Sequence, residues 1–583
     1  MGAPALDDAL RQLLAAQIVV SGISQQSLLF RHALIRDTAY QSLLSRKRLR
    51  YHQAIADAIV KSHTNVATTQ PELVARHYTV ARRDDLALPY WKQAGTRALE
   101  HSANYEAVDH FSNALAIAEK LPEGPGRGYE TLFVRTRLAE ALTQAGRLKE
   151  AVTLFRVATE QARREDNASS FVRAALGFDL AQFLGGGVAR DQSIMFLTEA
   201  ESKTAPGDDR QRCLILVGLA RAYLLLGDTE KSEGFDRRAS DLARRLGDRE
   251  SLFNLSINRF LVPRIASSTD VHGRLAELDD LLELARGIND DEMTQRALSL
   301  DVYVSTELGK RARANLSLSA LTELGKSRQR LHAQWVARCG ATMFAGLDGD
   351  FATAEVLAEE AQELGRLTSG DQFGGIYGIQ MFSIRREQGR LAEVAPVIKG
   401  FIEENPDEIT WQPGFALIAA DLGFKEPALR RLRQLGEGGF KMPVDAMRSA
   451  SLSYLAEVAA LLDDAESASR LYELMSVYEH MTITAGIATV CYGAASRYLG
   501  MLAATFGEID RAEGHFEHAI AMNTEMSASP WLAHTKAEYA SLLSRRGTKG
   551  AREHADALAN EAWKMAAELG MVRLKKRLQR WIH

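Results

Sequence analysis

Apolar residues recur at helical spacing along most of the 583-residue chain. Between residues 134 and 158 they fall three or four positions apart, and Gly146 interrupts the run. This spacing places apolar side chains on one face of a helix, and a glycine can end a helix in the left-handed conformation. The pattern therefore predicts two amphipathic helices joined by a short turn.

The second of these predicted helices carries a small–aromatic–small signature at Ala151, Phe155 and Ala158. A small residue allows two helices to approach closely, and the aromatic residue fills the space beside the next helix pair. Complete or partial copies occur at Ala107, Phe111 and Ala114; Ala239; Ala354, Ala358 and Ala361; Val394, Ile398 and Phe401, with Pro406 as a stop; Ala512, Phe516 and Ala519; and Ala555, Ala559 and Ala562.

The predicted turns are regularly spaced. Those at positions 309, 349, 389, 423, 463, 507 and 550 lie 34 to 44 residues apart. The steps from 146 to 227 and from 227 to 309 are about twice as long, which predicts weaker units near Gly186 and Arg264. Repeats of this length bury their apolar faces by stacking on neighbours. The expected fold class is all-α: a superhelix of about twelve helical hairpins.

The signature resembles the tetratricopeptide repeat, whose usual period is 34 residues. Most units here are longer, as in the MalT-like variant of that repeat. We place the repeats at residues 91–583 and a helical connector at 61–90. Residues 1–60 do not fit the repeat: helix, short β segment, turn, second β segment and helix follow one another there, which suggests a winged-helix-like remnant.

Larger stretches resemble a bacterial architecture. They are LLFRHALIRDTAYQSLLSRKRLRYHQAIADAI, then PELVARHYTVA, and near the C-terminus ASRYLGMLAATFGEIDRAEGHFEHAIAM. They resemble the region that follows the AAA/STAND-type ATPase module in adenylate/guanylate cyclases and LuxR-type regulators. In such proteins a cyclase domain and an ATPase module precede the motif that begins here at His32. Only 31 residues precede His32, so we expect both modules to be absent, and we expect no enzymatic activity.

The composition is typical of a globular protein, and the small net charge produces no strong electrostatic field. The formal net charge is −4 and 25% of residues are charged, so we expect neither nucleic acid nor a membrane surface as a partner. The N-terminus lacks the basic and apolar regions of a secretory signal, and the longest apolar stretch contains Arg221. Cys213, Cys339 and Cys491 are far apart in sequence, as expected for packing in a cytoplasmic protein.

Three motifs can each be interpreted either as a binding site or as an ordinary part of a helix. The string ALTELGKS, from Ala320 to Ser327, fits a relaxed phosphate-loop pattern, but the residues before it are helical in pattern. His515 and His518 have metal-ligand spacing, but Phe516 between them is a core position, which predicts that they flank it at the surface. The basic run from Arg46 to Arg50 fits a solvated helix face. We expect no cofactor and no metal ion.

The candidate binding residues are large side chains that packing does not require. In tetratricopeptide-type arrays the first helix of each hairpin lines the concave face, and arginine and aromatic side chains supply much of the contact energy at interfaces. The side chains predicted to bind a partner on this basis are Arg135, Arg221, Trp335, Arg338, Tyr377, Arg385, Trp411 and Arg497.

These observations favour a non-catalytic scaffold or sensor of a signalling system. It would bind a protein or peptide, such as a separately encoded cyclase or ATPase, or a small effector. Two alternatives stay open. The chain is a truncated C-terminal part of an adenylate/guanylate cyclase with its ATPase module, or it is a transcriptional regulator that lacks its DNA-binding domain.

Overall fold

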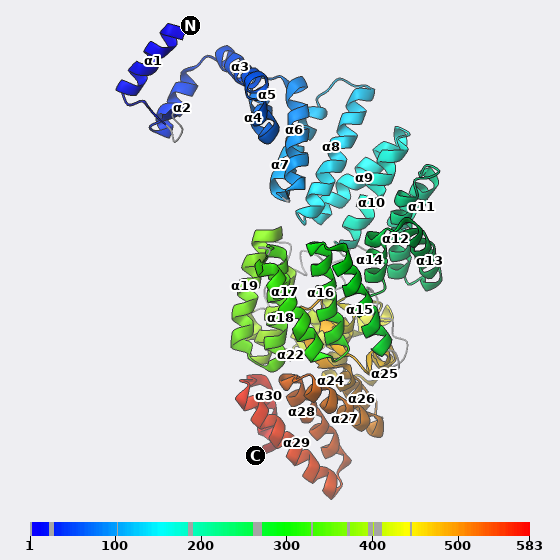
Figure 1. Ribbon diagram of the computed structural model, residues 1–583. Coiled ribbons are helices and arrows are strands. Elements are labelled where there is room, and N and C mark those ends of the chain that lie inside the picture. The colour runs from blue at the N-terminus through cyan, green and yellow to red at the C-terminus, as the bar shows by residue number, and fades with distance from the viewer. Residues whose placement is uncertain are drawn as a thin grey trace. The chain divides into compact units, whose positions relative to one another are not determined.

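The computed structural model describes residues 3–21, 28–101, 103–184, 190–260, 271–327, 330–369, 374–393, 400, 411–442 and 446–582. The chain divides into two compact units: unit 1 comprises residues 1–145 and 153–166, and unit 2 comprises 146–152 and 167–583. Both consist mainly of α-helices that pair as antiparallel neighbours (Figure 1). The predicted fold class, an all-α array of helical hairpins, is confirmed.

Unit 1 begins with a helix, a two-stranded hairpin and a second helix, and continues as paired helices whose core includes Trp91 and Phe111. Strands β1 (Val19–Ser21) and β2 (Leu28–Phe30) are antiparallel. The helices are α1 (Ala3–Ala15), α2 (Ala33–Ser42), α3 (Ser45–Ser62), α4 (Thr64–Thr69), α5 (Pro71–Val80), α6 (Asp84–Glu100), α7 (Asn104–Ala118), α8 (Pro125–Gln144) and most of α9 (Leu148–Arg164).

Unit 2 is also built mainly of paired helices. Its first helices are α10 (Ala168–Leu184), α11 (Arg190–Lys203), α12 (Asp209–Leu226), α13 (Thr229–Leu246), α14 (Arg249–Asn258), α15 (Val271–Ile288), α16 (Asp291–Glu307), α17 (Arg311–Ser327), α18 (Leu331–Asp348), α19 (Phe351–Ser369) and α20 (Gly374–Glu387), with a 3-10 turn, η3, at Leu391–Glu393. After residue 411 come α22 (Gln412–Asp421), α23 (Lys425–Glu437), α24 (Arg448–Leu462), α25 (Ala465–Met475), the 3-10 turn η5 (Ser476–Tyr478), α26 (Ala495–Thr505), α27 (Ile509–Glu525), α28 (Ser529–Arg546), α29 (Lys549–Glu568) and α30 (Val572–Ile582).

The predicted turns are found where the glycines are. Gly227 ends α12 with φ 89°, and its backbone N–H donates to the carbonyl of Leu224. Glycines at the six other predicted glycine turns within the described residues also have positive φ: 146, 309, 349, 389, 423 and 507. One position is wrong: Gly550 lies within α29, and the residue that ends α28 with φ 73° is Gly547.

The small–aromatic–small signature is buried as predicted, but its aromatic ring also packs on the preceding helix of the same hairpin, which was not predicted. Ala512, Phe516 and Ala519 are all buried on α27. A Cβ atom added at Gly500 of α26 would lie 2.9 Å from the Phe516 ring, so the ring rests directly on the backbone of the preceding helix. The same relation joins Gly95 of α6 to Phe111 of α7, at 2.8 Å. The signature therefore records close contact between the two helices of one hairpin.

Some predicted repeats lie partly or wholly outside the described residues. Gly186 and Arg264 are in this group, but the helices that flank them, α10 with α11 and α14 with α15, pack on each other. Val394, Ile398, Phe401 and Pro406 also lie outside the described residues.

The sequence did not predict a β-hairpin inside unit 2. Strands β3 (Thr482–Ala485) and β4 (Val490–Ala494) are antiparallel, and every residue of both is buried. β3 packs on α16 and α24, and β4 packs on α18, α27 and α28. The Thr482 hydroxyl donates to the carbonyl of Thr306 at 2.7 Å, and the Trp531 indole N–H donates to the carbonyl of Cys491 at 3.0 Å. The hairpin thus joins helices that are far apart in sequence, such as α16 through Thr306 and α28 through Trp531.

Distant helices also contact each other directly within unit 2. His534 of α28 pairs with Glu387 of α20 at 2.8 Å, and Arg573 of α30 pairs with Asp421 of α22 at 2.6 Å. A Cβ atom at Gly349 would lie 2.7 Å from the Leu569 side chain. In this part of the chain the helices therefore also contact helices that are not their sequence neighbours, which the stacking of repeats did not predict.

The N-terminal elements follow the predicted order with one difference. A single helix was expected after the hairpin, and the structure has α2 and α3, separated at Leu43 and Leu44. The compact division near residues 145–167 was not predicted, whereas the boundaries at 60 and 90 stay predictions. Among the described residues, the helices are too short or too polar to cross a membrane.

Candidate interaction surface

The first 55 residues expose an unusual number of large apolar side chains. They hold 11 of the 30 such side chains found in the described part of the chain, although they are under a tenth of its length. Helix α2 has no buried residue among those described, and Leu34 on it is 80% exposed. We call this set the N-terminal apolar surface: Leu13, Leu14, Val20, Leu28, Leu29, Phe30, Leu34, Tyr40, Leu44, Tyr51 and Ile55.

The hairpin in this segment is apolar on both faces. Leu28, Leu29 and Phe30 are consecutive in β2, so their side chains alternate between the faces, and all three are exposed. A two-stranded hairpin is marginally stable at best in water, and helices as short as α2 depend on packing. Exposed apolar area costs roughly 25 cal/mol per Å² relative to burial. The segment therefore exposes the kind of apolar side chains that are usually buried in an interface.

Basic residues are frequent in the sequence of the same segment, and we call them its basic border. Between residues 28 and 62 there are seven arginines and lysines but two aspartates, in a chain whose overall formal charge is −4. Arg46, Lys47 and Arg50 are exposed on α3, as the sequence predicted. A partner that covers the leucines and complements this border presents apolar side chains edged by acidic ones.

The predicted binding residues occupy different positions. Arg497 is 1% exposed and Trp335 is 7% exposed, so neither reaches the surface. Their predicted role in binding a partner does not fit this geometry, because packing and ion pairing inside unit 2 enclose both side chains.

The other six predicted residues have contacts within the chain, and their role in binding stays a prediction. Three pair with a carboxylate outside their own helix: Arg135 with Glu119 at 3.1 Å, Arg338 with Glu360 at 3.2 Å and Arg385 with Glu355 at 3.3 Å. Arg221 pairs with Asp179 and lies 4.6 Å from the centre of the Phe183 ring. Tyr377 packs on the main core, and the Trp411 ring lies beside Gly375.

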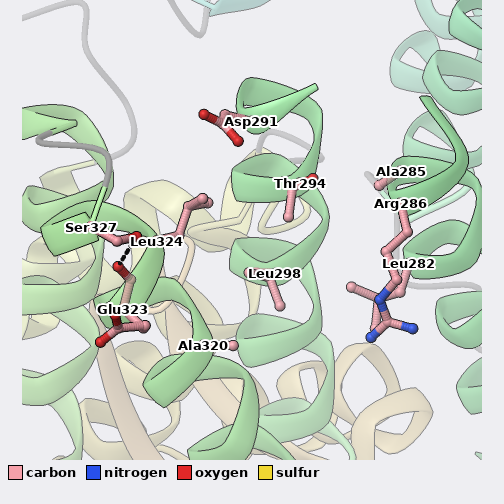
Figure 2. A pocket seen from close by; sticks show the side chains of 10 residues that line it. All are labelled: Leu282, Ala285, Arg286, Asp291, Thr294, Leu298, Ala320, Glu323, Leu324 and Ser327. Atoms are coloured by element: carbon pink, nitrogen blue, oxygen red, sulfur yellow. Dashed lines mark hydrogen bonds between the residues drawn. The ribbon is translucent and has the colours of Figure 1, made fainter. Parts of the chain in front are cut away.

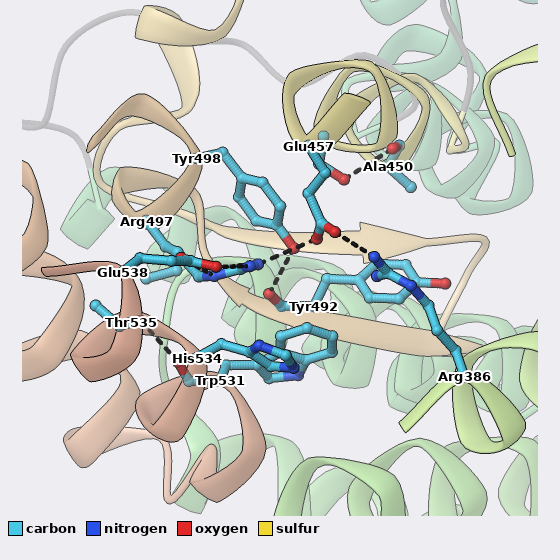
Figure 3. A network of polar contacts seen from close by, with 12 residues as sticks. Arg386, Ala450, Glu457, Tyr492, Arg497, Tyr498, Trp531, His534, Thr535 and Glu538 are labelled. Carbon is cyan, nitrogen blue, oxygen red and sulfur yellow. Dashed lines mark hydrogen bonds and ion pairs between the residues drawn. The ribbon is translucent and has the colours of Figure 1, made fainter. Parts of the chain in front are cut away.

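Arg497 belongs to a buried network of ion pairs in unit 2 (Figure 3). Its Nε and Nη2 atoms donate to both oxygens of Glu538, at 2.8 and 2.6 Å, and its Nη1 atom donates to Glu457 at 3.2 Å. Glu457 also pairs with Arg386, which donates to Asp421 at 2.6 Å. Five helices, α20, α22, α24, α26 and α28, supply these groups, and Tyr492 of the β3–β4 hairpin lies beside them, so the network fixes their arrangement.

The charges in this network shift the pKa values of its members. Burial alone raises the pKa of Glu457, but the charges of Arg386 and Arg497 outweigh burial and hold it below its usual value. Burial also opposes ionisation of Glu387, but the charge of His534 and its hydrogen bond lower the pKa of Glu387 to about 2. Carboxylates with such low pKa values are permanently charged, which suits an ion-pairing role and not proton transfer.

An open groove lies between α15, α16 and α17 (Figure 2). Its volume is about 360 Å³. Leu282, Leu298 and Leu324 supply apolar contact area, whereas Arg286 and Glu323 add charge at its edge. The groove has the mixed lining that a small amphipathic molecule requires, but a small effector remains a prediction.

The phosphate-loop interpretation of ALTELGKS is excluded by its conformation. Ala320 to Ser327 form the last two turns of α17, and the Ser327 hydroxyl donates to the carbonyl of Glu323 at 2.7 Å. A phosphate loop needs free backbone N–H groups between a strand and a helix. The helical conformation predicted for this string is confirmed.

The histidine pair differs from the prediction. His515 is buried, not at the surface, and its Nε2 atom lies 2.9 Å from the Tyr472 hydroxyl. The reason is that Tyr472 and Glu479 provide polar partners beside Phe516, so a histidine can be buried there. His518 is half-buried, and its ring is tilted against that of His480, with the ring centroids 5.1 Å apart. Among the described residues no cluster of three or more potential ligands has the geometry to hold a metal ion.

Comparison with protein families and with curated proteins gives no match. Among solved structures, one similar chain is a STAND protein (signal transduction ATPase with numerous domains) with a tetratricopeptide repeat sensor, from Pyrococcus horikoshii. The two chains are 13% identical, with a TM-score of 0.37, and the alignment covers 82% of this chain and 69% of the other. A likeness at this level carries no conclusion about the function of this chain.

Proposed function

We propose that this chain is a non-catalytic protein-interaction scaffold of a signalling system, and that it docks a partner through the N-terminal apolar surface. The observation that carries the proposal is the exposure of Leu28, Leu29, Phe30, Leu34 and Leu44 beside a basic border. Large apolar patches on a folded protein typically mark interaction sites.

The filled interior of unit 2 supports the proposal that a partner docks at the N-terminal segment. The helices α16, α18 and α28 pack on the buried β3–β4 hairpin. The hairpin thus occupies the space between the helices that a bound peptide would need. The charged groups named above in this interior form ion pairs, such as Arg386 with Glu457 and His534 with Glu387. We therefore assign docking to the N-terminal segment in place of this interior.

The resemblance of residues 28–59 to the segment after an ATPase module suggests the class of partner. We propose a separately encoded signalling ATPase or nucleotide cyclase whose docking face is apolar with acidic edges. The scaffold would hold this partner while the helical array responds to an effector or a second protein.

Co-purification from the native host tests this proposal. The full-length chain should recover an ATPase or a cyclase, and a variant with Leu34→Asp and Leu44→Asp should not, because two carboxylates would then lie in an apolar interface. Leu316→Asp is the matched control, since Leu316 on α17 is also highly exposed but lies outside the N-terminal segment. Recovery of the same ATPase or cyclase by the double variant would refute docking at this surface, and recovery of neither class would refute the proposed partner.

A further inference from the structure

Three side chains of unit 1 form a hydrogen-bonded chain between three helices. The Tyr40 hydroxyl on α2 lies 3.0 Å from Nε2 of His52 on α3. Nδ1 of His52 lies 2.8 Å from Nδ1 of His77 on α5. The rings are also in contact, with centroids 5.7 Å apart for Tyr40 and His52 and 4.9 Å apart for the two histidines. We call this arrangement the Tyr40–His52–His77 relay.

Helix α2 depends on this relay for its side-chain contacts with α3. In the described part of unit 1, the hydrogen bonds and ring contacts between the two helices all involve Tyr40: its bond and ring contact with His52, and the Arg48 guanidinium 5.4 Å from its ring centre. The helix buries none of its described residues. A loss of the relay would therefore remove the side-chain hydrogen bond and the ring contact that join α2 to α3, and leave α2 held mainly by β2.

The geometry allows one added proton but not two. With both histidines neutral, Tyr40 donates to His52, and His52 donates from Nδ1 to the free Nδ1 of His77. A single proton is tolerated, because a charged His52 can donate from both ring nitrogens, to Tyr40 and to His77. When both imidazoles are charged, each Nδ1 carries a hydrogen and neither can accept, so the 2.8 Å contact becomes repulsive.

The surroundings offer no carboxylate to compensate two charges. Among the described residues, no acidic side chain lies within ion-pair distance of either imidazole, and Asp57 on α3 instead accepts a hydrogen bond from Tyr78 on α5 at 2.8 Å. Arg48 on α3 and Arg76 on α5 add positive charge nearby in sequence, Glu72 lies one turn further along α5, and α4 carries no charged residue. Burial lowers the pKa of His52, and burial together with the charge of His52 lowers that of His77.

We propose that the Tyr40–His52–His77 relay is a proton-sensitive device that fixes α2 on α3 at neutral pH and releases it in mild acid. Release moves Leu34 and Tyr40, two members of the N-terminal apolar surface, away from their neighbours. The resulting loss of partner binding in acid rests on the proposed function, but the release of α2 does not.

Hydrogen exchange of the full-length chain, without a partner, tests the device. Protection factors for the amides of α2, corrected for the intrinsic effect of pH, should fall about tenfold between pH 7.5 and pH 5.5, as the loss of one hydrogen bond implies. In His77→Asn, which keeps an uncharged group at the Nδ1 position, the fall should be less than about threefold. In Tyr40→Phe the protection should be low at both pH values.

His101→Asn is the matched control, because His101 is an exposed histidine of the same unit, and it should behave as wild type. The amides of α7 report whether each variant keeps unit 1 folded. A tenfold fall that persists in His77→Asn, or protection in Tyr40→Phe equal to that of wild type at pH 7.5, would overturn the proposal. Since no partner is present, these results are independent of whether the docking proposal holds.

Discussion

At the scale of single residues, buried charge is the feature with the largest energetic consequence. Arg497 is enclosed by Glu457 and Glu538, and its planar guanidinium reaches both oxygens of Glu538 at once. Lysine can carry the charge but cannot reproduce this paired geometry. Removing one partner of a buried ion pair costs several kcal/mol, because the charge left behind is uncompensated.

We expect Arg497→Lys to reduce the free energy of unfolding by about 2–3 kcal/mol, because one of its carboxylate contacts would be lost within a buried site. Arg338→Lys is the control: Arg338 pairs with Glu360, but 39% of its side chain is exposed, so the loss should stay within about 0.5 kcal/mol. Urea unfolding followed by circular dichroism measures both. Equal losses for the two variants would show that the network does not stabilise unit 2.

Glu307 is a buried carboxyl group that has no ion-pair partner among the described residues. Burial raises its pKa from 4.5 to about 7, although hydrogen bonds with Tyr303 and Thr484 and the charge of Arg274 act in the opposite direction. Since the pKa in the folded state is above that in the unfolded state, ionisation opposes folding. The associated stability is complete below pH 4.5 and is lost as the pH rises through 7.

We therefore expect the wild-type chain to lose about 1 kcal/mol of stability from this group between pH 6 and pH 8. Glu307→Gln keeps the shape and removes the charge, so it should abolish this part of the pH dependence. Glu426→Gln, at an exposed glutamate of α23, should leave it unchanged. Urea midpoints measured at both pH values test this, and an identical loss in wild type and Glu307→Gln would contradict the assignment.

At the scale of elements, the β3–β4 hairpin organises the second half of unit 2. Gly493 on β4 has φ 71°, and a Cβ atom there would lie 2.5 Å from Cβ of Trp531 and 2.7 Å from Oδ1 of Asn523. The Asn523 side chain in turn accepts a hydrogen bond from the backbone N–H of Ala494 at 2.9 Å. The strand thus lies against α27 and α28 without room for a side chain.

Gly493→Ala should reduce the free energy of unfolding by about 3 kcal/mol or more, from backbone strain and overpacking together. Gly227→Ala is the matched control for strain alone, since Gly227 has φ 89° but open space around it, and about 1 kcal/mol is expected. Thermal and urea unfolding would measure the difference. A loss at Gly493 no larger than that at Gly227 would mean that the hairpin is loosely packed.

The sequence predicted the helical hairpins well, because their apolar spacing and turn glycines are local signals. Phe155, Phe516 and the alanines around them are buried as their positions implied. The β3–β4 hairpin was missed, although the run TITAGIATV is rich in β-branched residues around a glycine, because the regular spacing of turns made a helix the natural interpretation.

The candidate binding residues could not be located from the sequence for a different reason. Whether Arg497 faces solvent or Glu538 depends on the contact of helices about 40 residues apart, which helical spacing does not encode. Similarly, α28 and α30 contact α20 and α22 through pairs such as His534 with Glu387. The sequence gives no signal that these two residues are partners.

At the scale of the whole molecule, the two units differ in where apolar side chains are left uncovered. In unit 2 the facing interior between α16 and α28 is filled by the chain itself. In unit 1 the three residues of β2 are exposed and none of the described residues of α2 is buried. The docking proposal rests on this difference, because 11 of the 30 large exposed apolar side chains of the described residues lie in the first 55 residues.

The most direct test of this account is the affinity of the captured partner for purified variants, measured by isothermal titration calorimetry at fixed salt. The account predicts that Leu34→Asp with Leu44→Asp weakens binding by about 100-fold or more, as for the loss of central interface residues, while Leu316→Asp binds as wild type. Affinity unchanged by the double variant would contradict the assignment of docking to the N-terminal apolar surface.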